Sequence, residues 1–463
     1  MTTQTAKIIS IPDNKQMLTN TSTTIDNYYT SSLDQDFLSK LADDSILQEE
    51  ILRRQKNILS EIAFLREENK WQEIVTLFYP LEQKEPELVS TGLDIIIRRE
   101  IAFALSIIKK FDESIKEFDE SIKEFEYCLK YEPDDFHNNA GIGFVFYNTL
   151  FSAKNKEIQL SPKEKKEFIK KAHFYLQKAQ NLRPDRVTSY YREAMLYRHI
   201  QGKNKKAIPL FKTAVENWGK YTDKQKSVRH QEYKNYIKSL YNLAACLAAN
   251  KQYKEALEFI NRCIKADREK DYIRREHKYF ALGKIQFHLE KFEEAKKSLE
   301  FASTFVSPEQ GDYIFELLAR TLLSLGKKQE ALDTITKIPP NRRRHYVIWT
   351  LADILVSLGK KKEAKKHLIR SIERDRRSRH KGLIRLCKLA FQKKDYEQSL
   401  KWAKEADKFH LDVYNTHDAD GLFWAAACYL KLNQKEKAKE VVEELSVFRP
   451  NYPFLPKLKQ FLN

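Results

Sequence analysis

The densest group of side chains that could do chemistry lies in the run HLDVYNTHDADG, residues 410–421. Its two histidines and two aspartates supply imidazole and carboxylate groups, which serve as zinc ligands and as acid–base catalysts: His410, His417, Asp418 and Asp420. The same residue types also form turns in which Asp or Thr caps the following helix. We predict the capping turn, with no metal and no catalytic residue.

The cysteines and the known catalytic motifs give no other sign of an enzyme. The five cysteines lie far apart without a C-x-x-C pair: Cys128, Cys246, Cys263, Cys387 and Cys428. Such spacing is neither a disulfide framework nor a zinc signature, and core packing explains these cysteines best. A Gly-rich phosphate loop, G-x-S-x-G and H-E-x-x-H are all absent from the sequence. We therefore expect no enzymatic activity and no cofactor.

Positive charge is the strongest binding signal in the chain. The net charge is +18, and residues 341–404 hold 20 Lys or Arg against 6 Asp or Glu. This basic band includes Arg342, Arg343, Arg344, Lys360, Lys361, Lys362, Arg374, Arg376, Arg377 and Arg379. Lys-rich turns are often no more than solvated surface, but Arg side chains suit carboxylates and phosphates. The band predicts contact with an acidic protein or a nucleic-acid backbone.

Helices must position these residues, because Gly and Pro are scarce and no stretch alternates between apolar and polar residues. Small residues recur in pairs twelve positions apart: Ala244 and Ala256, Gly283 and Ala295, Ala319 and Ala331, Ala352 and Ala364, Cys387 and Ser399, Ala426 and Ala438, with Ala102 and Ser114 upstream. Polar turns such as Gly326-Lys327-Lys328 separate the two members. Two helices joined by a tight turn approach closely where side chains are small, so each pair predicts one helical hairpin.

These hairpins resemble tetratricopeptide repeats. From Ala256 to Ala438 the second small residues step by 39, 36, 33, 35 and 39 residues, close to the family period of 34. Prolines of the family type follow several second helices, as in AHFYLQKAQNLRP, which ends at Pro184. The resemblance covers roughly residues 50–455 in about ten units, with Ile62 and Ile74 replacing the small pair in the first. It implies an all-α, right-handed superhelical solenoid.

In this family the first helix of each hairpin lines a concave groove that holds extended peptides. The resemblance therefore implies a partner-binding groove with aromatic and cationic side chains: Tyr191, Arg198, Tyr241, Phe280, Lys284, Arg320, Trp349, Lys381, Lys388 and Phe423. Aromatic rings between cations suit an acidic or aromatic segment. The family's carboxylate-binding set of Lys and Asn is matched by Asn242 alone, so that activity is not carried over.

Departures from the repeat define the predicted parts of the chain. We expect a disordered polar tail over 1–33, repeats with insertions over 34–220, a regular array over 221–455 and a capping tail over 456–463. The heptad FDESIKE stands twice over 111–124, and residues 147–169 lengthen another unit, with a helix start and capping box at Ser161. Residues 217–236 are predicted to be a polar connection.

Three functions remain open at this stage. The first is a cytoplasmic scaffold or adaptor that binds a protein partner, acidic or an extended peptide, and that has no membrane segment. The second is backbone-directed binding of RNA or DNA by the basic band. The third is a peptide-sensing regulator or a regulatory subunit of a larger complex. The oligomeric state is left open.

Overall fold

The computed structural model describes residues 35–108 and 114–462, and it is helical with no strand in these ranges. The predicted tail over 1–33 lies outside the described residues. None of the described helices is both long enough and apolar enough to span a bilayer. The chain divides into two compact units, residues 1–149 and 150–463. The boundaries predicted from the sequence remain predictions.

The first unit packs around apolar helix faces. Its helices are α1 (Gln35–Glu67), α2 (Trp71–Phe78), α3 (Leu81–Lys84), α4 (Pro86–Ser90), α5 (Ile95–Ile107) and α6 (Ser114–Tyr131), and α7 (Phe136–Lys154) continues into the second unit. Ile62 and Ile74 are buried where α1 meets α2. Arg98 on α5 is also buried, and it holds Glu82 at 2.7 Å and Glu124 at 2.9 Å. Its charge is therefore fully engaged within this unit.

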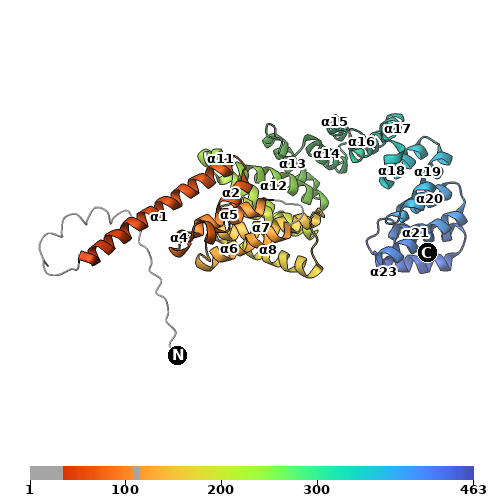
Figure 1. Cartoon of the computed structure of the whole chain (residues 1–463). Helices are drawn as coiled ribbons and strands as arrows, with labels where there is room; N and C mark the ends of the chain where they lie inside the picture. The colour runs from red at the N-terminus through yellow and green to blue at the C-terminus, as the bar shows by residue number, and fades with distance from the viewer. Residues whose placement is uncertain (1–34, 109–113, 463) are drawn as a thin grey trace, which may run out of the picture. The chain divides into compact units, whose positions relative to one another are not determined.

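Alternating first and second helices build the second unit (Figure 1). The first helices are α9 (Thr188–Met195) with the π-helical turn η1 (Leu196–Ile200), α12 (His230–Ala249), α14 (Arg275–His288), α16 (Asp312–Ser324), α18 (His345–Ser357), α20 (Arg379–Gln392) and α22 (Ala419–Lys431). The second helices are α8 (Pro162–Leu182), which follows α7, then α10 (Asn204–Lys220), α13 (Tyr253–Ala266), α15 (Phe292–Ser303), α17 (Lys328–Thr336), α19 (Lys361–Arg374), α21 (Tyr396–Tyr414) and α23 (Lys435–Phe448). From α12 onward each first helix contacts its own second helix and the next first helix. The all-α solenoid of helical hairpins is thus confirmed.

The small residues lie where the sequence placed them in six hairpins. Every member of the six pairs from Ala244 to Ala438 is buried at a helix crossing. A Cβ added to Gly283 would lie 2.6 Å from Leu299 Cγ, which shows how closely α14 and α15 approach. In α21, the Ser399 hydroxyl donates to the Cys387 carbonyl oxygen at 3.0 Å, so this pair also makes a hydrogen bond.

The upstream pair cannot be followed at Ser114, whose side chain lies outside the described residues. Ser121, seven residues later, lies against Ala102, and its hydroxyl donates to the Ala102 carbonyl oxygen at 2.6 Å. Ser114 and Ser121 occupy the same position of the duplicated heptad FDESIKE, so the second copy repeats the spacing of the first.

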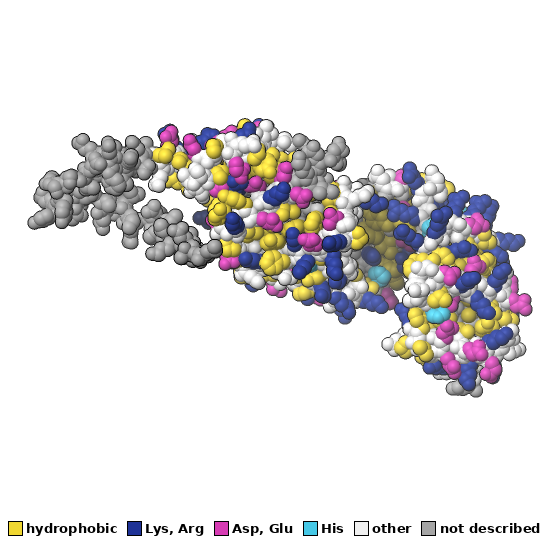
Figure 2. Space-filling model, turned by 60° about the horizontal axis from the view of Figure 1, so that its bottom comes forward, with side chains coloured by type: hydrophobic (Ala, Val, Ile, Leu, Met, Phe, Trp, Pro, Cys, Tyr) yellow, Lys and Arg dark blue, Asp and Glu magenta, His cyan; other side chains and the backbone are white. Residues whose placement is uncertain are grey.

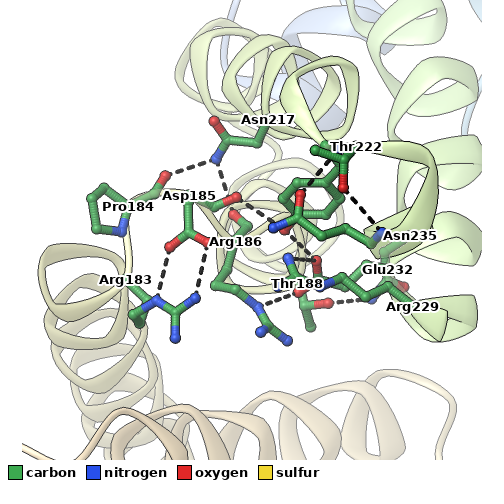
Figure 3. A network of polar contacts seen from close by, with 12 residues as sticks. Arg183, Pro184, Asp185, Arg186, Thr188, Asn217, Thr222, Arg229, Glu232 and Asn235 are labelled. Carbon is green, nitrogen blue, oxygen red and sulfur yellow. Dashed lines mark hydrogen bonds and ion pairs between the residues drawn. The ribbon is translucent and has the colours of Figure 1, made fainter. Parts of the chain in front are cut away.

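The region 217–236 is helical rather than a connection, contrary to the prediction. Within it α10 runs to Lys220, α11 (Asp223–Val228) follows, and α12 begins at His230. Buried Glu232 on α12 accepts from Arg186 Nε at 2.6 Å and from the Tyr221 hydroxyl (Figure 3). Asn217 Nδ2 donates to the Pro184 carbonyl oxygen at 2.8 Å. The polar residues that suggested a solvated connection instead join the segment between α8 and α9 to α10 and α12.

Two other local predictions agree with the structure. Ser161 and Glu164 form a reciprocal capping box at the start of α8, with the Ser161 amide 2.7 Å from Glu164 Oε2. At the end of the chain a short helix, α24 (Leu455–Gln460), packs on α22 and α23 through Leu455 and Leu458. This helix covers part of the apolar surface that the last hairpin would otherwise expose.

Candidate functional site

A hollow of about 540 Å³ opens beside η1, α10, α12 and α14 and brings together four residues of the predicted groove. These are Arg198, Tyr241, Phe280 and Lys284. The rest of the lining is His199, Asn204, Ala245, Ala248, Ala249, Ala281, Ile285 and His288. Four alanines at positions facing the hollow leave the space that larger side chains would fill. We call this space the groove hollow.

Arg198 is held in a fixed direction in the groove hollow. Its Nη1 donates to the Asn242 carbonyl oxygen at 3.0 Å and to Asn242 Oδ1 at 2.6 Å. Asn242 is itself oriented, because its Nδ2 donates to the Lys238 carbonyl oxygen at 2.7 Å. The π-helical turn η1 carries Arg198, and such turns often occur at functional sites.

The groove hollow is electrostatically positive. Burial, together with the nearby Arg198, lowers the pKa of His199 to about 4, although a hydrogen bond with Asn242 opposes the shift. Burial and the charges of Lys284 and Arg320 also lower the pKa of His288. Both imidazoles are therefore neutral at pH 7, and Arg198 and Lys284 supply the charge. No carboxylate is found among the described residues that line this hollow.

Farther along, cations lie over aromatic rings on α14, α16, α18, α20 and α22. Arg320 lies 4.9 Å from the ring centre of Phe287, and Lys388 lies 5.8 Å from that of Trp424. Lys381 and Arg385 both approach Trp349, at 5.6 and 5.5 Å. We call the surface formed by these contacts and the groove hollow the first-helix face. On the side drawn in Figure 2, Lys and Arg side chains border a recess with hydrophobic side chains on its floor.

Two carboxylates partly neutralise the positive charge of the first-helix face. Asp353 lies 2.9 Å from Arg385 Nη2. Glu316 accepts from the Thr350 hydroxyl at 2.6 Å and lies 3.8 Å from Arg320 Nε. Burial raises the pKa of Glu316, while its Thr350 hydrogen bond and Arg320 oppose the rise. The face is therefore a mixture of aromatic rings, cations and a few paired acids.

One predicted groove residue, Tyr191, is buried in the core, Phe423 is half-buried against the terminal segment, and three residues of the cation–ring contacts were missed. Tyr191 is 6% exposed and packs on Phe211 in the core. Phe423 packs on Tyr452 and Phe454 of the terminal segment, at 5.5 and 5.7 Å. The missed residues are Phe287, Arg385 and Trp424. Arg385 could have been found, because it follows Lys381 by four positions and so shares its side of the helix.

The residues singled out in the basic band gather at two edges of the hairpins. Lys360, Lys361 and Lys362 lie at the turn from α18 to α19. The arginines lie before α18 and from the last residue of α19 to the first residue of α20: Arg342, Arg343, Arg344, Arg374, Arg376, Arg377 and Arg379. A 13-residue helix separates the two edges by roughly 20 Å. Exposed Lys365, Lys366 and Arg370 lie on α19 between the two edges, so whether the basic band acts as one surface stays a prediction.

Some of these arginines have structural partners. Arg343 Nε donates to the Ile338 carbonyl oxygen at 2.8 Å, and burial lowers its pKa. Arg344 lies 3.3 Å from Asp312, and Arg379 Nη2 lies 2.6 Å from Glu405. The exposed remainder is Arg342, Arg374, Arg376 and Arg377, which we call the arginine edge.

The cluster of histidines and aspartates forms the predicted turn. Asp418 caps α22 by accepting from the Asp420 amide at 3.2 Å. His417 lies between Asp407 and Glu444, at 3.1 Å from each, and His410 Nδ1 is 2.7 Å from the Thr416 carbonyl oxygen. In the described part of the chain, no group of three or more His, Cys, Asp or Glu is arranged to hold a metal. These contacts orient α22, and Asp418 Oδ2 alone in this turn is buried without a hydrogen-bond partner.

Comparison with known proteins identifies the repeat. Models of the tetratricopeptide repeat match residues 237–270, 346–378 and 420–446. No curated protein matches. One similar solved structure is YrrB, described as a repeat protein with an unusual peptide-binding site; it is 18% identical, the match covers 51% of this chain and 97% of YrrB, and the TM-score is 0.35. Yeast Tom70 is 16% identical, with 77% of this chain and 66% of Tom70 covered and a TM-score of 0.36. Repeats of a putative kinesin light chain from Podosopora anserina are also similar, with 21% identity, 41% of this chain and 93% of that chain covered, and a TM-score of 0.33.

The three matched segments coincide with α12–α13, α18–α19 and α22–α23. Their buried small pairs recur in the hairpins between them. This chain therefore carries tetratricopeptide repeats.

Proposed function

We propose that the chain is a non-enzymatic adaptor that holds an extended, acidic segment of a partner protein along its first-helix face. The observation that carries the proposal is the groove hollow, where Arg198 and Lys284 meet Tyr241 and Phe280 without a lining carboxylate among the described residues. Cations favour acidic side chains, and the aromatic rings add contact area at low entropic cost.

The rest of the face extends the same chemistry. Lys381 and Lys388 on α20 lie over the rings of Trp349 and Trp424. A segment that leaves the groove hollow would therefore meet further aromatic and cationic groups. Arg385 is paired with Asp353, so a partner carboxylate would compete with Asp353 for this guanidinium. Binding is therefore expected to weaken as ionic strength rises.

Affinity capture with a charge-reversed variant tests this proposal. The double variant Lys284→Glu/Arg385→Glu should lose its specific partners by about tenfold or more, because like charges then face the acidic segment. The matched control is Lys254→Glu/Lys297→Glu, which reverses two exposed charges on the second helices α13 and α15. If both variants lose their partners equally, or if neither variant loses them, binding at the first-helix face is contradicted.

Backbone-directed binding of RNA or DNA is the second candidate, and the arginine edge supports it. Four exposed guanidiniums at one edge suit phosphates. A gel-shift titration at two salt concentrations should show a shift that weakens with salt and disappears in Arg374→Ala/Arg376→Ala/Arg377→Ala. The absence of any shift at low salt would remove this candidate.

A further inference from the structure

A second hollow of about 590 Å³ adjoins the groove hollow. It is lined by Ala153, Lys154, Lys156, Ile158, Gln159, Leu160, Lys165, His199 and Ile200. His199 lines both hollows, so they meet at the π-helical turn η1. We call the second space the lysine hollow.

Three lysines reach the lysine hollow from different parts of the chain. Lys154 ends α7, Lys156 follows it in the connection, and Lys165 lies in the first turn of α8. Within the described residues no carboxylate lines this space. The two acids nearest in sequence are occupied: Glu157 accepts from the Ser152 hydroxyl at 2.8 Å, and Glu164 closes the capping box. The three ammonium groups therefore lack a neutralising acid in the lining.

His199 couples the two hollows. Its Nδ1 lies 3.4 Å from Lys154 Nζ, and its Nε2 lies 3.3 Å from Asn242 Oδ1. Lys154 can only donate, so Nδ1 accepts and the Nε2 proton is donated to Asn242. The same Asn242 oxygen accepts from Arg198 in the groove hollow. A neutral imidazole thus joins the lysine hollow to Arg198 without adding a charge.

We propose that the lysine hollow takes a phosphate group carried by the partner segment that lies in the groove hollow, so that the chain selects a phosphorylated segment. This inference rests on the proposed function. A phosphorylated side chain carries a charge of about −1.5 to −2 and three acceptor oxygens, whereas a carboxylate carries −1. Three ammonium groups match the phosphate better. Ile158, Leu160 and Ile200 form apolar walls, which strengthen the attraction by excluding water.

Three fluorescent peptide pools with identical degenerate positions test the inference. The pools differ only at a central residue, which is phosphoserine, glutamate or serine, and each is titrated into the full chain by fluorescence polarisation. The phosphoserine pool should bind about tenfold to a hundredfold more tightly than the serine pool, with the glutamate pool in between. Equal affinity for the phosphoserine and glutamate pools would overturn the phosphate assignment in favour of a carboxylate.

The variant Lys156→Asn/Lys165→Gln should reduce the affinity for phosphoserine to that for serine. Asn is chosen at position 156 because φ there is 66°, which Asn tolerates. The control Lys254→Asn/Lys297→Gln makes the same changes on second helices, and circular dichroism verifies folding of both. Retained phosphoserine preference in the first variant overturns the inference. If all pools bind equally and Tyr241→Ala abolishes binding, the groove proposal stands alone; if no pool binds, both proposals fail.

Discussion

Small side chains set how closely the helices approach, and Gly283 gives the clearest case. An added Cβ at this position would lie 2.6 Å from Leu299 Cγ and 3.3 Å from the Ala295 carbonyl oxygen. The branch point of a leucine cannot move aside as freely as the end of a flexible side chain. The hairpin α14–α15 therefore depends on the missing methyl group.

We predict that Gly283→Ala is less stable than Gly219→Ala by about 1–3 kcal/mol, the usual cost of overpacking a core. Both positions lie in helices, so the gain in helix propensity cancels in the comparison. A Cβ at Gly219 meets no atom within 4 Å. Urea denaturation of both variants measures the difference, and equal stabilities would show that the crossing tolerates the methyl group.

Protonation of His380 at low pH should destabilise the second unit. Its ring stacks against Phe409 at 6.2 Å and meets His410 edge-on at 4.8 Å. Burial, together with the charges of His410 and Lys381, lowers its pKa to about 4, while Asp375 and Asp420 oppose the shift. The folded chain therefore holds this ring neutral where an unfolded histidine already takes up a proton, near pH 6.5.

The free energy of unfolding should consequently fall as the pH drops from about 6.5 toward 4, by up to about 1 kcal/mol per pH unit for one histidine. His380→Gln should flatten this dependence between pH 7.5 and 5. His230→Gln, at an exposed position, is the control. Urea midpoints across this range check the prediction, and identical slopes in wild type and His380→Gln would refute it.

The residue-level site was predictable only where helix spacing decides exposure. Arg198, Tyr241, Phe280 and Lys284 were placed in the groove and line one hollow. Tyr191 was misplaced because an aromatic residue on a first helix can face the groove or the second helix, and periodicity does not separate the two. The Arg198–Asn242 contact joins residues 44 positions apart, which no local pattern reveals.

At the scale of elements, a buried ion pair positions the connection between α13 and α14. Lys278 and Asp267 are both buried, with Lys278 Nζ 2.9 Å from Asp267 Oδ2. Asp267 also accepts from the backbone amides of Tyr272 and Ile273, at 2.8 and 2.9 Å. One carboxylate thus orders the chain between the two helices and fixes where α14 begins.

Lys278→Met should cost about 3–5 kcal/mol, because it leaves Asp267 buried without its cation. The double variant Asp267→Asn/Lys278→Met should lose less, since no buried charge remains. Thermal or urea unfolding of the two variants checks the order. A double variant less stable than the single one would mean that Asp267 is held by its backbone hydrogen bonds and not by Lys278.

The six second helices from α13 to α23 lie at the positions predicted from the sequence, because small residues, polar turns and apolar spacing agree in each of these hairpins. The region 217–236 was misjudged for a physical reason. Polarity normally indicates solvent exposure, but Glu232 and Asn235 are buried and satisfied by partners on other helices. The sequence does not specify which distant groups will meet them.

At the scale of the whole molecule, the alternation of first and second helices places the basic residues on different surfaces. A hairpin has its turn and its flanking connections at opposite ends, so Lys360–Lys362 and the arginine edge lie at different ends of α19. The first-helix face then becomes the better candidate for the binding surface, because its cations converge on aromatic rings. The exposed arginine edge remains a separate surface with its own test.

Site-directed photocrosslinking tests the central claim most directly. A benzophenone amino acid is placed at Phe280 or Trp424 on the first-helix face, and at Phe174 or Phe301, which are exposed on second helices. With the partner captured by the full chain, we predict crosslinks from Phe280 and Trp424 and none from Phe174 and Phe301. Crosslinks from the second-helix positions with none from the first-helix face would contradict the account.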